Sequence, residues 1–270
     1  MRRGYGRIGI FVGLLLFILL FFRHRNTFEK TVFVTDDTED EELPQQMRRN
    51  VIPTPCKSNH DRDSLACKLE TEVEHYMTQK AKWYCHFDDD NYVNIAALRR
   101  HLLPLNHSRR WYIGRPVTAD PLKHLYNKQE VHFWFATGGA GYCLSRGTVD
   151  VLRRLAGERV TVKAISDETQ FTDDVVMAFI LHFYANITLT VDRHFHSHIE
   201  LMHIFNDLNI QDEISLSYML SDKRSRSNIV NIRLVTNSPD SSRFRAIHCI
   251  LHRQTCTTPK IPPASPRGRR

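Results

Sequence analysis

Three consecutive aspartates, Asp88, Asp89 and Asp90, directly follow the apolar run 83–87. Carboxylates this close repel one another and raise one another's pKa, so an unpaired triplet is electrostatically costly. A hard divalent cation removes that cost, because Mg²⁺ or Mn²⁺ binds one or two carboxylates together with substrate phosphates. A solvated acidic turn with Asn91 as a helix cap is the alternative for an isolated triplet. The position at the end of an apolar run favours metal binding.

Histidines and a second acidic pair could complete such a site. His194, His196 and His198 alternate, so all three would face one way in an extended segment. One imidazole with one carboxylate suits Mn²⁺, although alternation by itself fits surface residues equally well. Asp173 and Asp174 open an apolar helical stretch, where a simple helix cap is the plain interpretation. The functional interpretation is a general base directed from the helix start.

A glycine-rich stretch, residues 138–141 (GGAG), is a further candidate. Its spacing matches neither the dinucleotide-binding fingerprint nor the P-loop, so neither of those nucleotide folds is supported. The stretch could still cradle a phosphate, or let a bound sugar approach the backbone closely.

Strands alternating with helices must position these residues. Apolar, β-prone runs predict strands at 31–35, 83–87, 111–113, 131–136 and 187–191, and residues 142–144 lead into the next helix. Helical periodicity predicts helices at 63–80, 93–103, from about 148, and 174–184. This alternation indicates an α/β sandwich with a largely parallel central sheet. Ligands bind such sheets at the carboxyl ends of strands, which is where the aspartate triplet lies.

The N-terminus carries an uncharged run of fifteen residues, 8–22, between Arg7 and Arg23. A bilayer span needs roughly twenty residues, but a thinner early-secretory membrane with snorkelling arginines accommodates a shorter run. A cleaved signal peptide is the alternative, although no small-residue cleavage site follows. We expect a cytoplasmic tail at 1–7, a transmembrane signal anchor at 8–22, a linker at 23–30, a domain at 31–256 and a disordered tail at 257–270.

Cysteines and glycosylation acceptors agree with a luminal domain. The six cysteines are an even number without the Cys-x-x-Cys spacing of a zinc site, which indicates disulfides in an oxidising compartment. They occupy positions 56, 67, 85, 143, 249 and 256. Asn106 and Asn186 each begin an N-glycosylation sequon.

The net charge of +7 would suggest a nucleic-acid partner, but the basic residues responsible for it lie at the two ends of the chain. Five arginines lie in the first 25 residues and four basic residues in the last eleven, with no acidic residue in either stretch. Subtracting these nine charges from +7 leaves −2 for residues 26–259. No basic stripe remains to neutralise phosphates, so we expect no nucleic-acid partner.

Four segments resemble the Fringe family: 82–94 (KWYCHFDDDNYVN), 131–143 (VHFWFATGGAGYC), 195–198 (FHSH) and 242–249 (SRFRAIHC). The resemblance runs from about residue 31 to 256. It implies a nucleotide-sugar transferase fold of the GT-A type and a single-pass type II Golgi membrane protein. It further implies an inverting β-1,3-N-acetylglucosaminyltransferase that uses UDP-N-acetylglucosamine (UDP-GlcNAc). The acceptor would be the 3-hydroxyl of O-linked fucose on EGF-like repeats of Notch receptors, whose signalling is thereby modulated.

The same resemblance implies a role for individual residues. Asp90 and His198 would bind Mn²⁺, Asp89 would contact the UDP-sugar donor, and Asp174 would be the catalytic base. The implied disulfide pairs are Cys56–Cys67, Cys85–Cys143 and Cys249–Cys256.

The resemblance also implies a stem and a first strand–helix unit ahead of residue 31, where only eight residues (23–30) follow the apolar run. We therefore expect an N-terminally incomplete catalytic domain. Three other functions stay open. They are a related β-1,3-galactosyl- or glucosyltransferase, a non-catalytic or dominant-negative carbohydrate-binding form, and, with least support, a nucleotide-hydrolysing enzyme.

Overall fold

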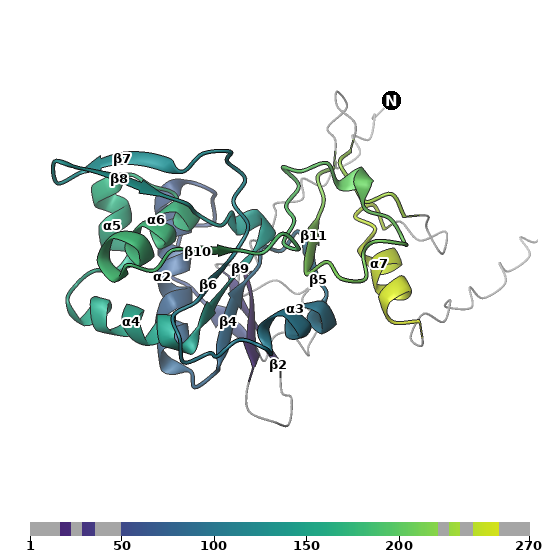
Figure 1. The fold of residues 1–270 in the computed structure, drawn as a ribbon, viewed down its shortest axis with the longest axis horizontal. Helices are drawn as coiled ribbons and strands as arrows, with labels where there is room; N and C mark the ends of the chain where they lie inside the picture. Colours follow the sequence, from purple (N-terminus) through teal and green to yellow (C-terminus); the bar gives the residue numbers. More distant parts are fainter. Residues whose placement is uncertain (1–16, 23–28, 36–49, 221–226, 233–239, 254–270) are drawn as a thin grey trace, which may run out of the picture.

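A seven-stranded mixed sheet organises the fold (Figure 1). The computed structural model describes residues 17–22, 29–35, 50–220, 227–232 and 240–253. The strand order is β10-β6-β9-β4-β1-β2-β3. In chain order these strands are β1 (Phe17–Phe22), β2 (Glu29–Thr35), β3 (Val51–Pro53), β4 (Trp83–His86), β6 (Tyr112–Gly114), β9 (Tyr142–Ser145) and β10 (Leu189–Val191).

The expectation of a largely parallel sheet is wrong. Strand β9 lies between β4 and β6 and runs antiparallel to both, and β1 runs antiparallel to β2 and β4. Within this sheet only the β10–β6 and β2–β3 pairs are parallel. The β4–β9 register pairs His86 with Tyr142, so the end of β4 meets the start of β9. Antiparallel pairing therefore brings the aspartate triplet and the glycine-rich stretch to the same end of these two neighbouring strands.

The last six residues of the expected membrane span lie in the sheet. Phe17–Phe22 form β1, which is paired on both sides, with β2 and with β4. A strand inside a covered sheet is as continuously apolar as a membrane segment, so composition alone does not separate the two. Residues 8–16 lie outside the described residues. In the part of the chain that is described, no helix is long and apolar enough to cross a bilayer.

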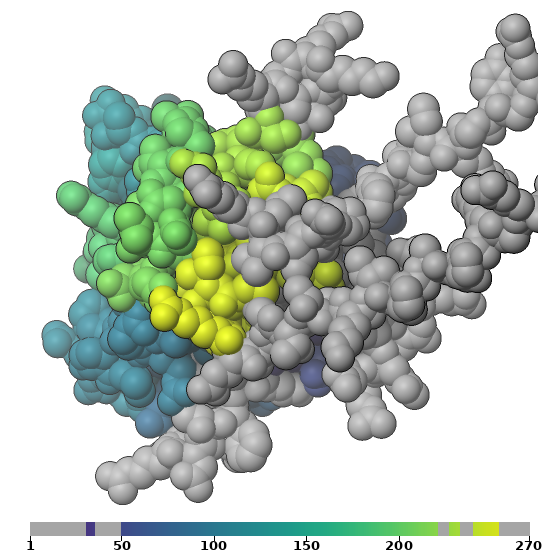
Figure 2. All heavy atoms as spheres, turned by 90° about the vertical axis from the view of Figure 1, so that its right-hand side faces the viewer, coloured from purple at the N-terminus to yellow at the C-terminus, as the bar shows by residue number. Residues whose placement is uncertain are grey.

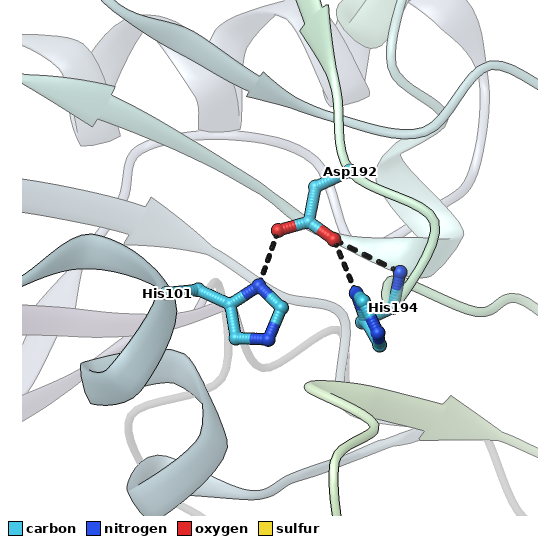
Figure 3. A group of neighbouring side chains, drawn as sticks. All are labelled: His101, Asp192 and His194. Carbon is cyan, nitrogen blue, oxygen red and sulfur yellow. Dashed lines mark hydrogen bonds and ion pairs between the residues drawn. The ribbon is translucent and has the colours of Figure 1, made fainter. Parts of the chain in front are cut away.

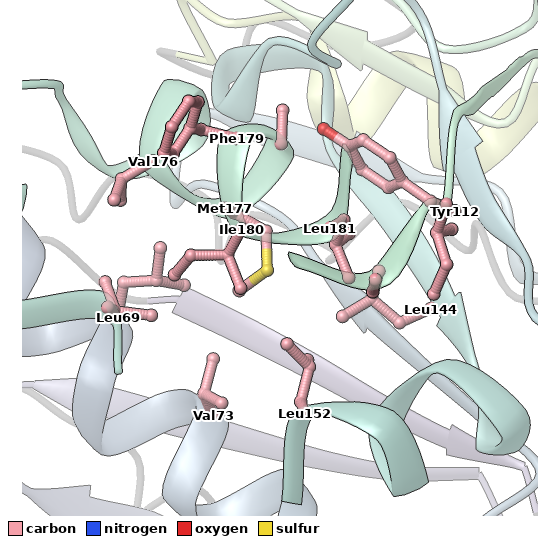
Figure 4. Packing of buried hydrophobic residues seen from close by; sticks show 14 of the residues in the cluster. Leu69, Val73, Tyr112, Leu144, Leu152, Val176, Met177, Phe179, Ile180 and Leu181 are labelled. Atoms are coloured by element: carbon pink, nitrogen blue, oxygen red, sulfur yellow. The ribbon is translucent and has the colours of Figure 1, made fainter. Parts of the chain in front are cut away.

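Four helices form a layer on one face of the sheet: α2 (Arg62–Thr78), α4 (Arg146–Gly157), α5 (Val162–Thr169) and α6 (Asp173–Phe179), which continues as a π-helical turn, Ile180–Tyr184. Their apolar side chains interdigitate with those of the strands, as Leu69, Leu144 and Met177 show in Figure 4. Asp61 and Ser145 cap α2 and α4 by accepting hydrogen bonds from main-chain N–H groups. Helix α5 was not predicted from the sequence.

A second cluster covers the opposite face. Successive strand residues point to opposite sides, so Tyr84 and Leu144 join the first core while Cys85 and Cys143 join the second. Helix α3 (Ile95–Leu102) packs here, and Asn94 caps its start. The predicted helix began two residues earlier, at 93.

Two small sheets complete the described structure. β5 (Asn91–Val93) pairs antiparallel with β11 (Ser215–Ser217), and β7 (Leu122–Tyr126) forms a hairpin with β8 (Gln129–Phe133). The chain also has 3-10 turns at Gly138–Ala140 and Met202–Ile204 and a helix α7 (Phe244–Leu251). Figure 2 shows α7, in yellow, beside the green segment around β11, and their apolar side chains share a third cluster.

Candidate functional site

The last aspartate of the triplet faces a histidine. The β5–β11 register pairs Asn91 with Ser217, which brings the hydroxyl of Ser217 to within 2.9 Å of Asp90 Oδ2. His198 Nδ1 lies 3.0 Å from the same oxygen. Both side chains stay accessible, with 26% of Asp90 and 32% of His198 exposed. The structure thus brings together the two residues predicted to bind a metal.

Charge favours a cation at this position. The hydrogen bond to Asp90 raises the pKa of His198, and the carboxylates of Asp90 and Asp88 add to that effect, against the opposing effect of partial burial. The imidazole is therefore drawn toward its protonated form by surplus negative charge. A divalent cation would replace that proton, because carboxylate and imidazole together form a donor set suited to Mn²⁺.

A buried histidine contacts Asp88, the first aspartate of the triplet. Asp88 Oδ1 lies 3.2 Å from Nε2 of the buried His86, whose Nδ1 lies 2.9 Å from Glu72 Oε2 on α2. Burial lowers the pKa of His86, but the carboxylates of Glu72 and Asp88 outweigh it and hold that pKa well above its usual value. Tyr76 donates a hydrogen bond to Glu72, and Tyr142 stacks on His86. Nothing in the sequence pattern indicated this buried support.

The glycine-rich stretch forms a tight turn against the triplet. Gly141 has a φ of +83°, and a Cβ there would lie 2.2 Å from the Phe87 ring, so only glycine fits. The carbonyl of Gly139 accepts a hydrogen bond of 3.0 Å from the Asn91 side chain. The turn is therefore fixed to the same loop that carries Asp88 and Asp90.

The acidic pair at the start of α6 lies against this turn. Asp174 Oδ2 accepts a hydrogen bond of 3.2 Å from the main-chain N–H of Gly138, and Oδ1 accepts one from Thr172. Burial raises the pKa of Asp174, while the Gly138 hydrogen bond opposes the rise. Burial, with repulsion from Asp174 and Asp88, raises the pKa of Asp173 to about 7. Sequence reasoning did not distinguish Asp173 from a simple cap residue.

The three alternating histidines do not share one face, because the chain turns at 193–194 instead of continuing as a strand. Only His198 joins the site. His196 Nε2 lies 2.8 Å from Glu213, and Arg115 and Glu200 flank its Nδ1. His194 lies 2.7 Å from Asp192. Asp89, between Asp88 and Asp90, is exposed.

Two buried polar atoms beside the site have no partner among the described residues: Asn91 Oδ1 and Ser197 Oγ. Buried polar atoms normally have hydrogen-bond partners in the protein or in ordered water, so these two can form hydrogen bonds with a ligand or a water molecule here. Both atoms lie close to the aspartate triplet and the glycine turn. Asn91 directly follows Asp90, and the Cβ of Ser197 is 3.7 Å from where a Cβ on Gly139 would lie.

Disulfides hold the site's framework. Cys85 and Cys143 face each other across β4 and β9 and are bonded, which ties the strand before the aspartates to the strand after the glycines. Cys56 and Cys67 form the other predicted pair. Cys249 is disulfide-bonded, and its predicted partner Cys256 lies outside the described residues.

A mixed α/β sheet with an aspartate triplet, a facing histidine and a glycine turn at one edge is compatible with a glycosyltransferase fold. A family model described as Fringe-like matches residues 19–255, and the chain belongs to this family.

Individual relatives agree with this assignment. The chain is 37% identical over 229 residues to the Fringe glycosyltransferase of Drosophila melanogaster, covering 83% of this chain and 55% of that protein. It is 36% identical to the β-1,3-N-acetylglucosaminyltransferase lunatic fringe of Gallus gallus (83% of this chain, 62% of the relative). Identity to the human lunatic fringe enzyme is 34% (86% and 62%). The chain therefore spans about 55–62% of the length of these relatives.

Proposed function

We propose that this chain is a metal-dependent β-1,3-N-acetylglucosaminyltransferase that moves N-acetylglucosamine from UDP-GlcNAc to the 3-hydroxyl of O-linked fucose on EGF-like repeats of Notch receptors. The observation that carries the proposal is the Asp90–His198 pair beside the glycine turn, with the acidic pair of α6 on the other side of that turn. The names of the relatives support the sugar that is transferred and the β-1,3 linkage.

Asp90 and His198 would hold Mn²⁺. When bound there, the ion would supply Lewis-acid stabilisation of the negative charge on the diphosphate leaving group. Asp89 is exposed, which suits a contact to the donor. Ser217 keeps the Asp90 carboxylate in one orientation through its hydrogen bond to Oδ2.

Asp174 would act as the general base. Its carboxylate is oriented by the Gly138 N–H and accepts the proton of the acceptor hydroxyl. The hydroxyl oxygen then bonds to the anomeric carbon as the bond from that carbon to the phosphate oxygen breaks, which inverts the configuration and releases UDP. A raised carboxyl pKa brings the base closer to neutral pH, where proton transfer is most effective.

We further propose a Golgi-luminal location. Disulfides persist in oxidising compartments, and two are present in the described residues. Asn106 and Asn186 are both exposed, as glycosylation requires. This part of the proposal rests on the disulfides and sequons, because the apolar residues Phe17–Phe22 belong to the sheet.

The test uses the full chain, produced in a eukaryotic secretory host and purified with its disulfides intact. Transfer from UDP-GlcNAc to an O-fucosylated EGF repeat is measured with MnCl₂, with EDTA, and for Asp174→Asn. We expect transfer that EDTA abolishes and that Asp174→Asn lowers about 10²–10⁴-fold. Asp207→Asn, at an exposed loop aspartate, is the matched control and should retain activity. Folded protein that binds the acceptor but transfers no sugar would overturn the catalytic proposal and favour the carbohydrate-binding form.

A further inference from the structure

Two histidines and an aspartate meet at a second place, formed by residues that the proposed transferase site does not use. His101 lies in the last turn of α3, Asp192 directly follows β10, and His194 lies two residues further on (Figure 3). One potential ligand atom from each lies within 4.8 Å of the other two. The three side chains are 25%, 15% and 39% exposed, so the cluster is sheltered but open to solvent.

The carboxylate of Asp192 lies between the two imidazoles. Oδ2 is 2.7 Å from His101 Nδ1, and Oδ1 is 2.7 Å from His194 Nδ1. The two rings are inclined at 67° with their centroids 4.4 Å apart. Both Nδ1 atoms therefore form hydrogen bonds with the same carboxylate from different directions, and a metal ion would replace these hydrogen bonds with bonds to all three side chains.

The main chain fixes this arrangement before any ion binds. The N–H of Asp192 donates to the Gly114 carbonyl (2.9 Å), and the N–H of His194 donates to Asp192 Oδ1 (3.1 Å). His194 in turn accepts a hydrogen bond of 2.8 Å from the N–H of Ile214. Asp192 and His194 are thus attached to β6 and to the residue before β11, while His101 comes from α3. A shared ligand would fasten all three elements together.

We propose that His101, Asp192 and His194 form a binding site for Zn²⁺ or a chemically similar divalent transition metal, separate from the proposed Mn²⁺ site. Two imidazoles and one carboxylate, with solvent as a fourth ligand, are a common donor set for Zn²⁺. The donor set at Asp90 and His198 is richer in oxygen and suits Mn²⁺ better. The two sites share no residue, so each can be removed without touching the other.

This site would restrain the segment that carries His198. Only three residues separate His194 from His198, and His196 between them is held by Glu213 and Ser215. Bound Zn²⁺ would therefore attach the segment that follows β10 to α3. The position of His198 opposite Asp90 depends on that segment. Its role is structural, and no step of sugar transfer passes through it.

The test begins with the full chain carrying Asp90→Asn and His198→Gln, which removes the proposed Mn²⁺ site. The protein is stripped of metal, dialysed and titrated with ZnCl₂, and bound zinc and Tm are measured. We expect one Zn²⁺ per chain and a rise in Tm. Adding His101→Gln and His194→Gln should abolish that zinc and that rise. Adding His60→Gln and His203→Gln instead, at two exposed histidines, should abolish neither.

A second measurement does not depend on the folding of variants. CoCl₂ added to the metal-stripped Asp90→Asn/His198→Gln chain should give visible absorption bands of a four- or five-coordinate site, and ZnCl₂ should remove them. Zinc that is bound equally after His101 and His194 are replaced would overturn the proposal. So would the absence of bound zinc and of cobalt bands from the chain in which both histidines are intact.

Discussion

The Nδ1 atom of His198 lies 3.0 Å from Oδ2 of Asp90, although 108 positions separate the two residues in the sequence. The β5–β11 pairing places Ser217 beside Asp90, and Ser217 Oγ also lies 3.4 Å from His198 Nδ1. The two side chains are therefore positioned for one ion before it binds, and removing either should weaken that ion's binding more than it disturbs the fold.

Asp90→Asn should weaken Mn²⁺ binding at least about tenfold, because a neutral amide replaces the carboxylate that a hard cation prefers. His198→Gln should also weaken it, and the double variant should lose less than the sum of the two effects, since both groups serve one ion. Titration of Mn²⁺ followed by electron paramagnetic resonance measures this. Asp207→Asn is the control, and unchanged Mn²⁺ affinity in Asp90→Asn would contradict the assignment.

The raised pKa of Asp173 predicts how the free energy of unfolding changes with pH. A carboxyl raised to about 7 binds its proton more tightly in the folded chain than in the unfolded chain. Raising the pH from about 4 to 7 therefore removes stability, because ionisation costs more in the folded state. Asp173→Asn should stabilise the metal-free chain on the order of 2–4 kcal/mol at pH 8. At pH 4 it should change little.

Urea unfolding at both pH values, with disulfides intact, measures that difference. Asp207→Asn is exposed and should give no pH-dependent change. An equal effect of Asp173→Asn at pH 4 and pH 8 would show that the aspartate acts through packing and not through its charge.

The sequence predicted the elements with strong periodicity. The helix expected at 63–80 is α2, and the strand expected at 83–87 is β4, because their apolar spacing is set by burial on one face or on both. Strands β5 and β7 were missed, since their sequences, NYV and LKHLY, are not continuous apolar runs. Strand direction was wrong because the composition of a covered strand does not reveal its neighbours.

Of the candidate site, the residue types were predictable and the supporting contacts were not. Asp90 and His198 were expected to meet, and they do. The Glu72–His86 pair could not be foreseen, because a glutamate on a helix face is usually solvated and only the packing of α2 on β4 buries it. The alternation of His194, His196 and His198 wrongly predicted that the three side chains face one way, because the chain turns at 193–194.

Glu72 should be essential to the stability of the buried contacts beneath the aspartate triplet. Its side chain is fully buried against His86, which in turn holds Asp88. Glu72→Gln removes one of the two carboxylates that contact the charged imidazole, and breaking a buried ion pair costs about 3–5 kcal/mol. The neighbouring Glu74→Gln, exposed on the same helix, should cost little. Thermal unfolding compares them, and equal stability of the two variants would contradict the charge pairing.

The glycine turn gives the sharpest prediction about the site itself. Gly141→Ala would place a Cβ 2.2 Å from the Phe87 ring and force an alanine into a φ of +83°. Because Phe87 directly precedes Asp88, the clash is expected to move the aspartate triplet as well as to destabilise the chain, by roughly 2–4 kcal/mol. Gly157→Ala, at the end of α4 with no atom within 4 Å of the new Cβ, is the matched control and should be neutral. Unfolding by urea measures the loss of stability, and Mn²⁺ affinity measured at a temperature where Gly141→Ala stays folded reports the displaced triplet. Wild-type Mn²⁺ affinity in the folded variant would show that the turn supports the fold without positioning the aspartates.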